Sequence, residues 1–171
     1  MTNNFVLRSL RYTFQIGDSQ MIALFGSAGY QVTWQQVSDM LKKEDDPAYK
    51  KCWDAELAVF LNGFISWKRQ QTEEHQSPSP QRKPEQHLTN NIILRKLKIA
   101  LELKDEDILE ILTLAGLPVS KPELSAFFRK PGHKNYRSCK DQILRNFLKG
   151  LQLKYRPESN HNSDFKWKMK K

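Results

Sequence analysis

The sequence predicts an all-α protein made of two homologous four-helix units, and three observations lead to this prediction. The segments Asn3–Phe14 (NNFVLRSLRYTF) and Asn90–Leu101 (NNIILRKLKIAL) are two versions of one pattern, 87 positions apart. The offset of 87 then holds without a gap as far as Arg69 and Arg156. Apolar residues recur every three or four positions in both copies, as on one face of a helix. A repeat of this length indicates duplication of one supersecondary unit.

The first helix of unit 1 is expected to span Asn3–Phe14, because its apolar residues form one stripe at helical spacing. Asn3 or Asn4 is the expected N-cap, since a short polar side chain there accepts a hydrogen bond from a free amide of the first turn. In unit 2 the same pattern predicts a helix over Asn90–Leu101, with its N-cap within Thr89–Asn91.

Paired start signals predict the second and third helices of each unit. The second helices are expected to begin near Asp18 and Asp105, whose carboxylates suit the positive end of a helix dipole. The third helices follow Thr33 and Ser120, each with Gln or Glu three residues later, which is the pattern of a capping box.

The last helix of each unit contains an interior glycine, Gly63 in unit 1 and Gly150 in unit 2. A glycine inside a helix costs about 1 kcal/mol relative to alanine, so its repetition indicates that another helix backbone passes close by. The polar connector before each last helix contains a matched cysteine, Cys52 or Cys139. We interpret these cysteines as small buried side chains.

An arginine recurs in the two first helices as Arg8 and Arg95, and an aspartate recurs at the start of the two last helices as Asp54 and Asp141. We expect each arginine to pair with the aspartate of its own unit, in a structural role.

The chain is expected to divide into four parts: unit 1 (1–69), a flexible polar linker (70–88), unit 2 (89–156) and a disordered basic tail (157–171). The linker is polar, contains prolines and shows no periodicity. Units of about 67 residues fold alone only marginally. We therefore expect the two either to pack together in pseudo-twofold fashion or to be loosely tethered and lean on a partner.

Positive charge is concentrated in the second unit. The net charge of the chain is +9, yet residues 1–69 carry only +1, whereas residues 88–156 carry +7. A basic excess of this kind favours contact with nucleic acid or another anionic surface.

The strongest candidates for nucleic-acid contacts lie in the connector and last helix of unit 2. Such residues neutralise phosphates and produce affinity that is sensitive to salt and tolerant of sequence. A solvated charged face is the alternative interpretation. The candidates are Arg129, Lys130, Lys134, Arg137, Lys140, Arg145 and Lys149.

A role as a protein–protein adaptor is the alternative function. Here the contact face would combine the acidic connector of unit 1 with tryptophans. The candidate residues are Trp34, Glu44, Asp45, Asp46 and Trp53, together with Trp67.

Base readout through a helix-turn-helix is a weaker possibility. The segment Phe25–Leu41 has a helix, a turn and a capped second helix, but the outward positions of that second helix carry no lysine or arginine.

No pattern points to an enzyme, a cofactor or a metal site. There is no Gly-rich phosphate loop, and the four histidines lie in expected loops, linker or tail without metal-ligand spacing. No apolar run approaches the roughly 18 residues needed to span a bilayer. The N-terminus does not resemble a signal peptide, so the expected location is the cytoplasm.

Several motifs resemble those of a known family. They are NN-x-x-LR-x-LR near the start of the unit, AGY-x-V-T/S in its middle, and KKEDDPAY with C-x-D and FLNG-x-I-x-x-KR at its end. This set resembles the YehS-like bacterial proteins, which consist of two copies of a domain of unknown function. The resemblance covers about four fifths of the chain, although unit 2 has RKPGHKNY and FLKGLQLKYR at the last motifs. It implies a small cytoplasmic bacterial protein with tandem helical domains, and no activity to transfer.

Overall fold

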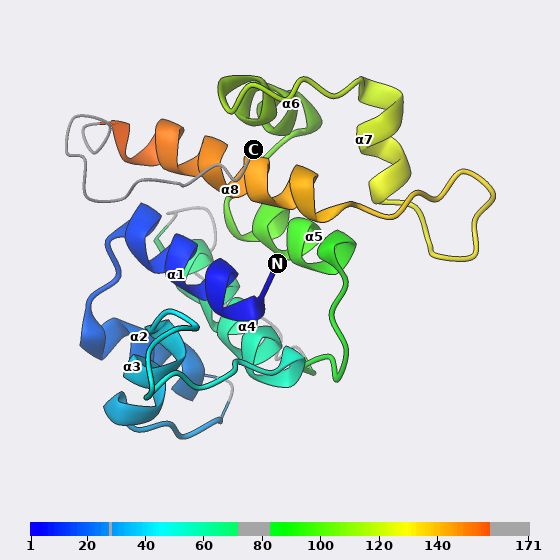
Figure 1. Ribbon diagram of the computed structural model, residues 1–171. Coiled ribbons are helices and arrows are strands. Elements are labelled where there is room, and N and C mark those ends of the chain that lie inside the picture. The colour runs from blue at the N-terminus through cyan, green and yellow to red at the C-terminus, as the bar shows by residue number, and fades with distance from the viewer. Residues whose placement is uncertain (28, 72–82, 158–171) are drawn as a thin grey trace.

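A computed structural model of the chain describes residues 1–27, 29–71 and 83–157, and these residues form helices and connecting loops without a strand (Figure 1). Under the offset of 87, each helix of the first unit corresponds to one of the second, so the predicted duplication of a four-helix unit is confirmed. The helices are α1 (Asn3–Phe14), α2 (Asp18–Gly26), α3 (Trp34–Leu41), α4 (Asp54–Gln70), α5 (Asn90–Ala100), α6 (Asp105–Leu114), α7 (Lys121–Phe127) and α8 (Asp141–Tyr155).

The two units pack against each other through two equivalent helix pairs. Helix α1 lies against α8, and α4 lies against α5. These pairs exchange under the duplication, because α1 corresponds to α5 and α8 corresponds to α4. The packing is therefore pseudo-twofold, and the two units are in direct contact along both seams (Figure 1). The expected linker and tail lie largely outside the described residues.

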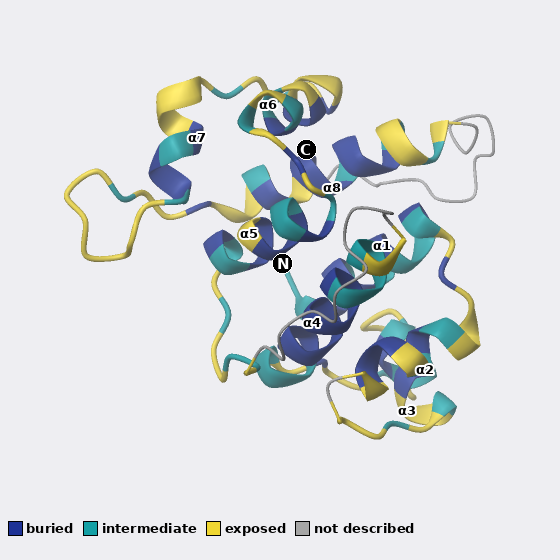
Figure 2. Cartoon of the chain, turned by 180° about the vertical axis from the view of Figure 1, so that it is seen from behind, coloured by how far each residue is buried: buried dark blue, intermediate teal, exposed yellow. Residues whose placement is uncertain are grey.

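One continuous apolar core runs through both units, and each helix turns its buried face toward it (Figure 2). Phe14 joins the units directly, since its ring lies 5.2 Å from the ring of Phe64 in unit 1 and 5.2 Å from that of Tyr155 in unit 2. Aromatic pairs at such distances contribute about 0.5–1.5 kcal/mol beyond the burial of their area.

Gly63 and Gly150 lie where the last helix of each unit crosses the second helix. A Cβ atom on Gly63 would overlap the carbonyl oxygen of Leu24 in α2, and one on Gly150 would overlap that of Ile111 in α6. The predicted close approach of helix backbones is therefore confirmed at both positions.

The first helices are capped by threonines, and the prediction of Asn3 or Asn4 as the N-cap of α1 is wrong. The hydroxyl of Thr2 accepts a hydrogen bond from the amide of Phe5 at 3.2 Å. In unit 2 the hydroxyl of Thr89 accepts the counterpart bond from the amide of Ile92, and Thr89 lies within the range predicted for that N-cap. Threonine is a good cap, and the two asparagines that follow it have other partners, described below.

Arg8 and Arg95 bind the third helix of their own unit. Arg8 donates to the carbonyl oxygen of Lys42 at 2.8 Å, and Arg95 donates to that of Phe128 at 2.9 Å. Both carbonyls lie at the C-terminal end of a helix, where a cation is favoured by the helix dipole and satisfies a free acceptor. The predicted arginine–aspartate pairs do not form.

Candidate functional site

The two connectors have the same backbone scaffold. Connector 1 is residues 42–53, between α3 and α4, and connector 2 is residues 129–140, between α7 and α8. The amide of Lys50 donates to the carbonyl of Asp39 at 3.0 Å, and the amide of Arg137 makes the counterpart bond to Ala126 at 3.2 Å. Each connector thus folds back onto the third helix of its unit at the same place.

A buried asparagine on the first helix holds each connector. The side-chain amide of Asn4 donates to the carbonyls of Met40 and Lys50, both at 2.8 Å, and its oxygen accepts from the amide of Cys52 at 2.9 Å. Asn91 makes the three counterpart bonds at 3.0, 2.8 and 2.9 Å. Sequence reasoning missed this role, although the repeated NN pair was its signal.

The preceding asparagine in each unit fixes the far end of the connector. Asn3 donates to the carboxylate of Asp54 at 2.7 Å, and Asn90 donates to that of Asp141 at 2.8 Å. Both asparagines also donate to the carbonyl of the cysteine two residues before the aspartate. The aspartates predicted to pair with arginines are thus bound by asparagines.

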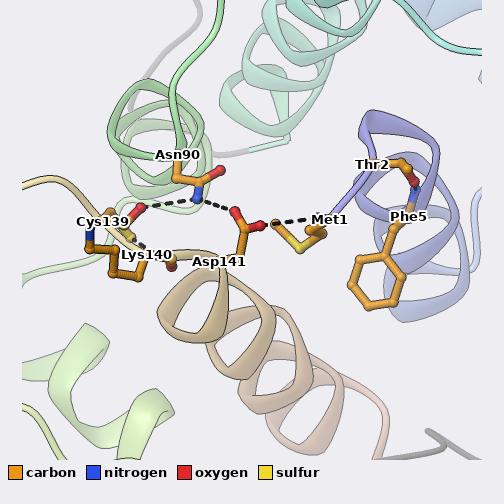
Figure 3. A network of polar contacts seen from close by, with 7 residues as sticks. All are labelled: Met1, Thr2, Phe5, Asn90, Cys139, Lys140 and Asp141. Carbon is orange, nitrogen blue, oxygen red and sulfur yellow. Dashed lines mark hydrogen bonds and ion pairs between the residues drawn. The ribbon is translucent and has the colours of Figure 1, made fainter. Parts of the chain in front are cut away.

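The same aspartates also connect the two units, and Figure 3 shows the contact at Asp141. The amino group of Met1 lies 3.0 Å from Asp141 of unit 2, and the amide of Leu88 donates to Asp54 of unit 1 at 3.0 Å. Met1 and Leu88 are equivalent under the duplication. The hydrogen bonds from Asn90 and from the amino group of Met1 lower the pKa of Asp141.

On this common scaffold, connector 2 lacks the carboxylates of connector 1. Residues 42–53 carry four lysines and three acidic residues, a net charge of +1, whereas residues 129–140 carry five basic and no acidic residues, a net charge of +5. The acidic residues Glu44, Asp45 and Asp46 correspond to Pro131, Gly132 and His133.

One of these replacements preserves a turn while it removes a charge. The carboxylate of Asp46 accepts the amide of Ala48 at 2.8 Å, and Nδ1 of His133 accepts the amide of Asn135 at 3.0 Å. A neutral imidazole nitrogen therefore does the same structural work as the carboxylate.

A second replacement lies on the third helix beside the connector. In unit 1, Asp39 accepts a hydrogen bond from Lys42 at 2.8 Å, and this bond lowers the pKa of Asp39. The counterparts of these residues are Ala126 and Arg129. Arg129 is exposed and makes no ion pair with any described residue. Comparison of the two units in the sequence was the available signal for this difference.

Three of the predicted nucleic-acid contacts line one surface hollow of about 520 Å³. They are Arg129, Lys134 and Arg137, and the ring of Tyr136 joins them. One carboxylate, that of Glu123, also lines the hollow. Figure 2 shows the surrounding connector as an exposed loop between α7 and α8.

The other four predicted contacts are spread more widely. Lys130 and Lys140 are exposed in the same connector, and Arg145 is exposed on α8. Lys149 is half-buried on α8, so its charge is less accessible than that of Arg145.

The candidate protein-contact residues do not form one compact face. Glu44, Asp45 and Asp46 are exposed in connector 1, which follows α3, whereas Trp34 lies at the opposite end of that helix. Eight helical residues separate them by about 12 Å. Trp53, at 59% exposure, lies in connector 1 itself with the ammonium group of Lys51 4.3 Å from its ring centre. Trp53 immediately precedes the N-terminal end of α4, whereas Trp67 lies near the C-terminal end of that helix.

The two cysteines are free and buried, in agreement with the interpretation from sequence. Burial raises the pKa of Cys52 to about 12 and that of Cys139 to about 12. Within the described part of the chain, no group of three or more metal-ligating side chains gathers. None of the helices in that part is long and apolar enough to cross a membrane.

Comparison with known proteins agrees with the duplication. The family model described as "Protein of unknown function (DUF1456)" matches twice, over residues 3–70 and 90–156. The chain is 42% identical to the uncharacterized protein YehS of Escherichia coli (strain K12) over 151 residues, which is 88% of this chain and 94% of that protein. No solved structure has significant similarity to the chain. The chain therefore belongs to the DUF1456 family, the family of YehS, and contains two tandem copies of its domain.

Proposed function

We propose that this chain is a non-enzymatic nucleic-acid-associated protein that binds the phosphate backbone through connector 2 and the adjoining hollow. The observation that carries the proposal is the systematic loss of carboxylates between two connectors of one scaffold. In connector 1 and on the adjoining third helix, four acidic positions of unit 1 are uncharged in unit 2, and their counterparts there are Ala126, Pro131, Gly132 and His133.

The arrangement of the cations supports backbone contact rather than base readout. Arg129, Lys134 and Arg137 surround a hollow wide enough for a phosphate group, and the neighbouring Lys130 and Lys140 extend the positive surface along the connector. Guanidinium groups bind phosphate oxygens in bidentate fashion. Contacts of this kind position a protein on nucleic acid without reading its sequence.

The decisive variant is Ala126→Asp, which removes no cation. The new carboxylate would lie beside Arg129 as Asp39 lies beside Lys42, where the distance is 2.8 Å. We expect affinity for a fluorescently labelled duplex, measured by anisotropy at stepped salt concentrations, to fall about fivefold to tenfold. The slope of log affinity against log salt should decrease by about 1.

Ala23→Asp is the charge control, because it adds the same charge at an exposed position of α2 in unit 1. Ala126 itself is only 8% exposed, so circular dichroism and thermal unfolding must first show that Ala126→Asp keeps the fold of the unmodified chain. Ala23→Asp should leave the affinity within about twofold, since it lies outside connector 2 and exposed charges are screened over about 10 Å in salt. Absence of duplex DNA or RNA binding at low salt, or equal loss in both variants, would contradict the proposal.

A protein–protein adaptor is the second candidate function, and Trp53 favours it. This large aromatic side chain is 59% exposed in connector 1. Exposed tryptophans are common anchors of protein interfaces. The adaptor hypothesis predicts that one defined partner co-purifies in a salt-tolerant manner, with nuclease present, and is lost in Trp53→Ala but retained in Ala126→Asp.

A further inference from the structure

Tyr136 is the one aromatic residue that lines the hollow beside connector 2, and its hydroxyl differs from that of its counterpart. In unit 1 the hydroxyl of Tyr49 donates to the side-chain oxygen of Asn4 at 3.0 Å. In unit 2 the oxygen of Asn91 accepts from the amide of Cys139. Within the described part of the chain, the hydroxyl of Tyr136 makes no hydrogen bond. The Tyr136 ring therefore lines the hollow without the bond that fixes Tyr49.

The backbone on both sides of Tyr136 is nevertheless held in place. The amide of Tyr136 donates to the carbonyl of His133 at 2.9 Å, and the next amide, that of Arg137, donates to Ala126 of α7 at 3.2 Å. The carbonyl of Arg137 accepts from the buried side chain of Asn91 at 2.8 Å. The loop that carries the ring is thus fixed before any ligand arrives, which lowers the entropic cost of binding.

Cations surround the ring of Tyr136. Arg129, Lys134 and Arg137 line the same hollow, are exposed, and form no ion pair with any described residue. Glu123 supplies the one carboxylate of the lining, so the hollow keeps a positive net charge. Proteins that bind single-stranded nucleic acid combine the same groups, since cations follow the phosphates and bases stack on aromatic rings.

The shape of the connector favours unpaired bases over paired ones. Connector 2 projects from the body of the molecule between α7 and α8, and it contains neither a helix nor a strand (Figure 1, Figure 2). The major groove of B-DNA admits an α-helix or a two-stranded ribbon, so this loop has no element that would read paired bases there. A base reaches the face of the Tyr136 ring only where it is unpaired and unstacked.

From these observations we infer that the hollow is a binding site for single-stranded nucleic acid, in which one base stacks on Tyr136 and the neighbouring phosphates contact the surrounding cations. The inference rests on the proposed function and narrows its ligand to a strand with unpaired bases. The phosphate contacts are available to a duplex as well, whereas the stacking contact is not. The volume of about 520 Å³ lies within the range of sites that hold small molecules.

Fluorescence anisotropy at low salt with three labelled probes tests this inference. The probes are a single strand of about 12 nucleotides, an abasic strand of the same length and charge, and the corresponding duplex. The unmodified chain should bind the single strand at least about fivefold more tightly than the abasic strand, because a stacked base contributes at least that factor. Equal affinity for these two strands would overturn the inference, and duplex binding would still support the proposed function.

Tyr136→Leu is the decisive variant, since leucine keeps an apolar side chain and removes the aromatic face. It should lower the affinity for the single strand about fivefold to tenfold and leave the affinities for the abasic strand and the duplex within about twofold. Tyr136→Phe keeps the ring and should retain the affinity for the single strand within about twofold. Equal losses for all three probes in Tyr136→Leu, with the fold intact by circular dichroism, would refute stacking.

Ala126→Asp separates this inference from the proposed function. Its carboxylate should weaken the binding of all three probes, because it opposes the phosphates that they share. If no probe binds, both proposals fail. If all three bind and Tyr136→Leu changes none of the affinities, the stacking site alone fails.

A free nucleotide has the same chemistry as one residue of a strand, and competition distinguishes the two sources. Adenosine monophosphate should displace the labelled single strand only weakly, with a dissociation constant above about 1 mM, because it offers one phosphate to three cations. Displacement at much lower concentrations would assign the hollow to a free nucleotide and overturn the assignment to a strand.

Discussion

Connector 1 and connector 2 share one backbone scaffold but differ in charge, since connector 1 is nearly neutral and connector 2 is strongly basic. Asn4 and Asn91 hold them with equivalent bonds to three backbone groups, and Asp46 and His133 close the same turn with different acceptors. The net charge nevertheless changes from +1 to +5. The comparison teaches that the two copies retain the hydrogen bonds that hold the connector in place. The charged side chains that take no part in those bonds differ between the copies.

The shared asparagine scaffold predicts the largest effects. Asn4→Ala and Asn91→Ala should each lower the free energy of unfolding by about 2–4 kcal/mol, because each leaves buried backbone groups without partners. Urea unfolding followed by circular dichroism measures this change. Asn135→Ala, at an exposed position of connector 2, is the control and should be nearly neutral. Asn4 also accepts a hydrogen bond from the hydroxyl of Tyr49 at 3.0 Å, so its loss should be somewhat the larger. A larger loss for Asn91→Ala than for Asn4→Ala would contradict this account.

The helix crossings should be equally symmetric. Gly63→Ala and Gly150→Ala should each cost about 2–3 kcal/mol, since the added methyl group meets a backbone carbonyl that cannot move easily. Gly26→Ala is the matched control because nothing lies within 4 Å of a Cβ there. It should be neutral or stabilising by up to about 1 kcal/mol. Thermal unfolding of the three variants distinguishes these outcomes, and a mild effect at Gly150 alone would show that the second crossing is looser.

The matched cysteines predict a pH dependence. Burial raises the pKa of each thiol from 9.0 to about 12. Above pH 9 the unfolded chain loses these protons while the folded chain keeps them, so stability falls as pH rises from 9 toward 12. The expected loss is about 1 kcal/mol per thiol for each pH unit above 9. Unfolding of the unmodified chain and of a Cys52→Ala, Cys139→Ala variant across this range should converge at high pH, and parallel curves would contradict the prediction.

Exchange of the connector charges should have the smallest effect on the fold. A variant with Glu44→Pro, Asp45→Gly and Asp46→His gives connector 1 the residues of connector 2 at its three acidic positions. Its stability should stay within about 1 kcal/mol, because exposed charges contribute little and histidine can close the turn. Duplex affinity, measured by anisotropy, should rise about twofold to fivefold if charge is what distinguishes the connectors. If duplex affinity is unchanged, residues other than these three positions are responsible for the difference between the connectors.

Local patterns were sufficient to predict much of this structure. The eight helices, the capping at Thr33, the buried cysteines and the crossings at Gly63 and Gly150 all followed from spacing within a few residues and from the repeat. The wrong predictions, the N-cap of α1 and the arginine–aspartate pairs, concerned polar groups with several possible partners. A side-chain amide or guanidinium has several donors, and sequence spacing does not select among them.

The seams between the units and the connector scaffold depended on tertiary contacts. Asn4 bonds Lys50 across 46 positions, and Arg156 bonds Tyr12 across 144. Periodicity identified which helix face is apolar, but not that α1 would bury it against α8 of the other unit. The physical reason is that burial of an apolar stripe is non-directional, so the choice among apolar partners is made by shape and by the few directional bonds that form once the units meet.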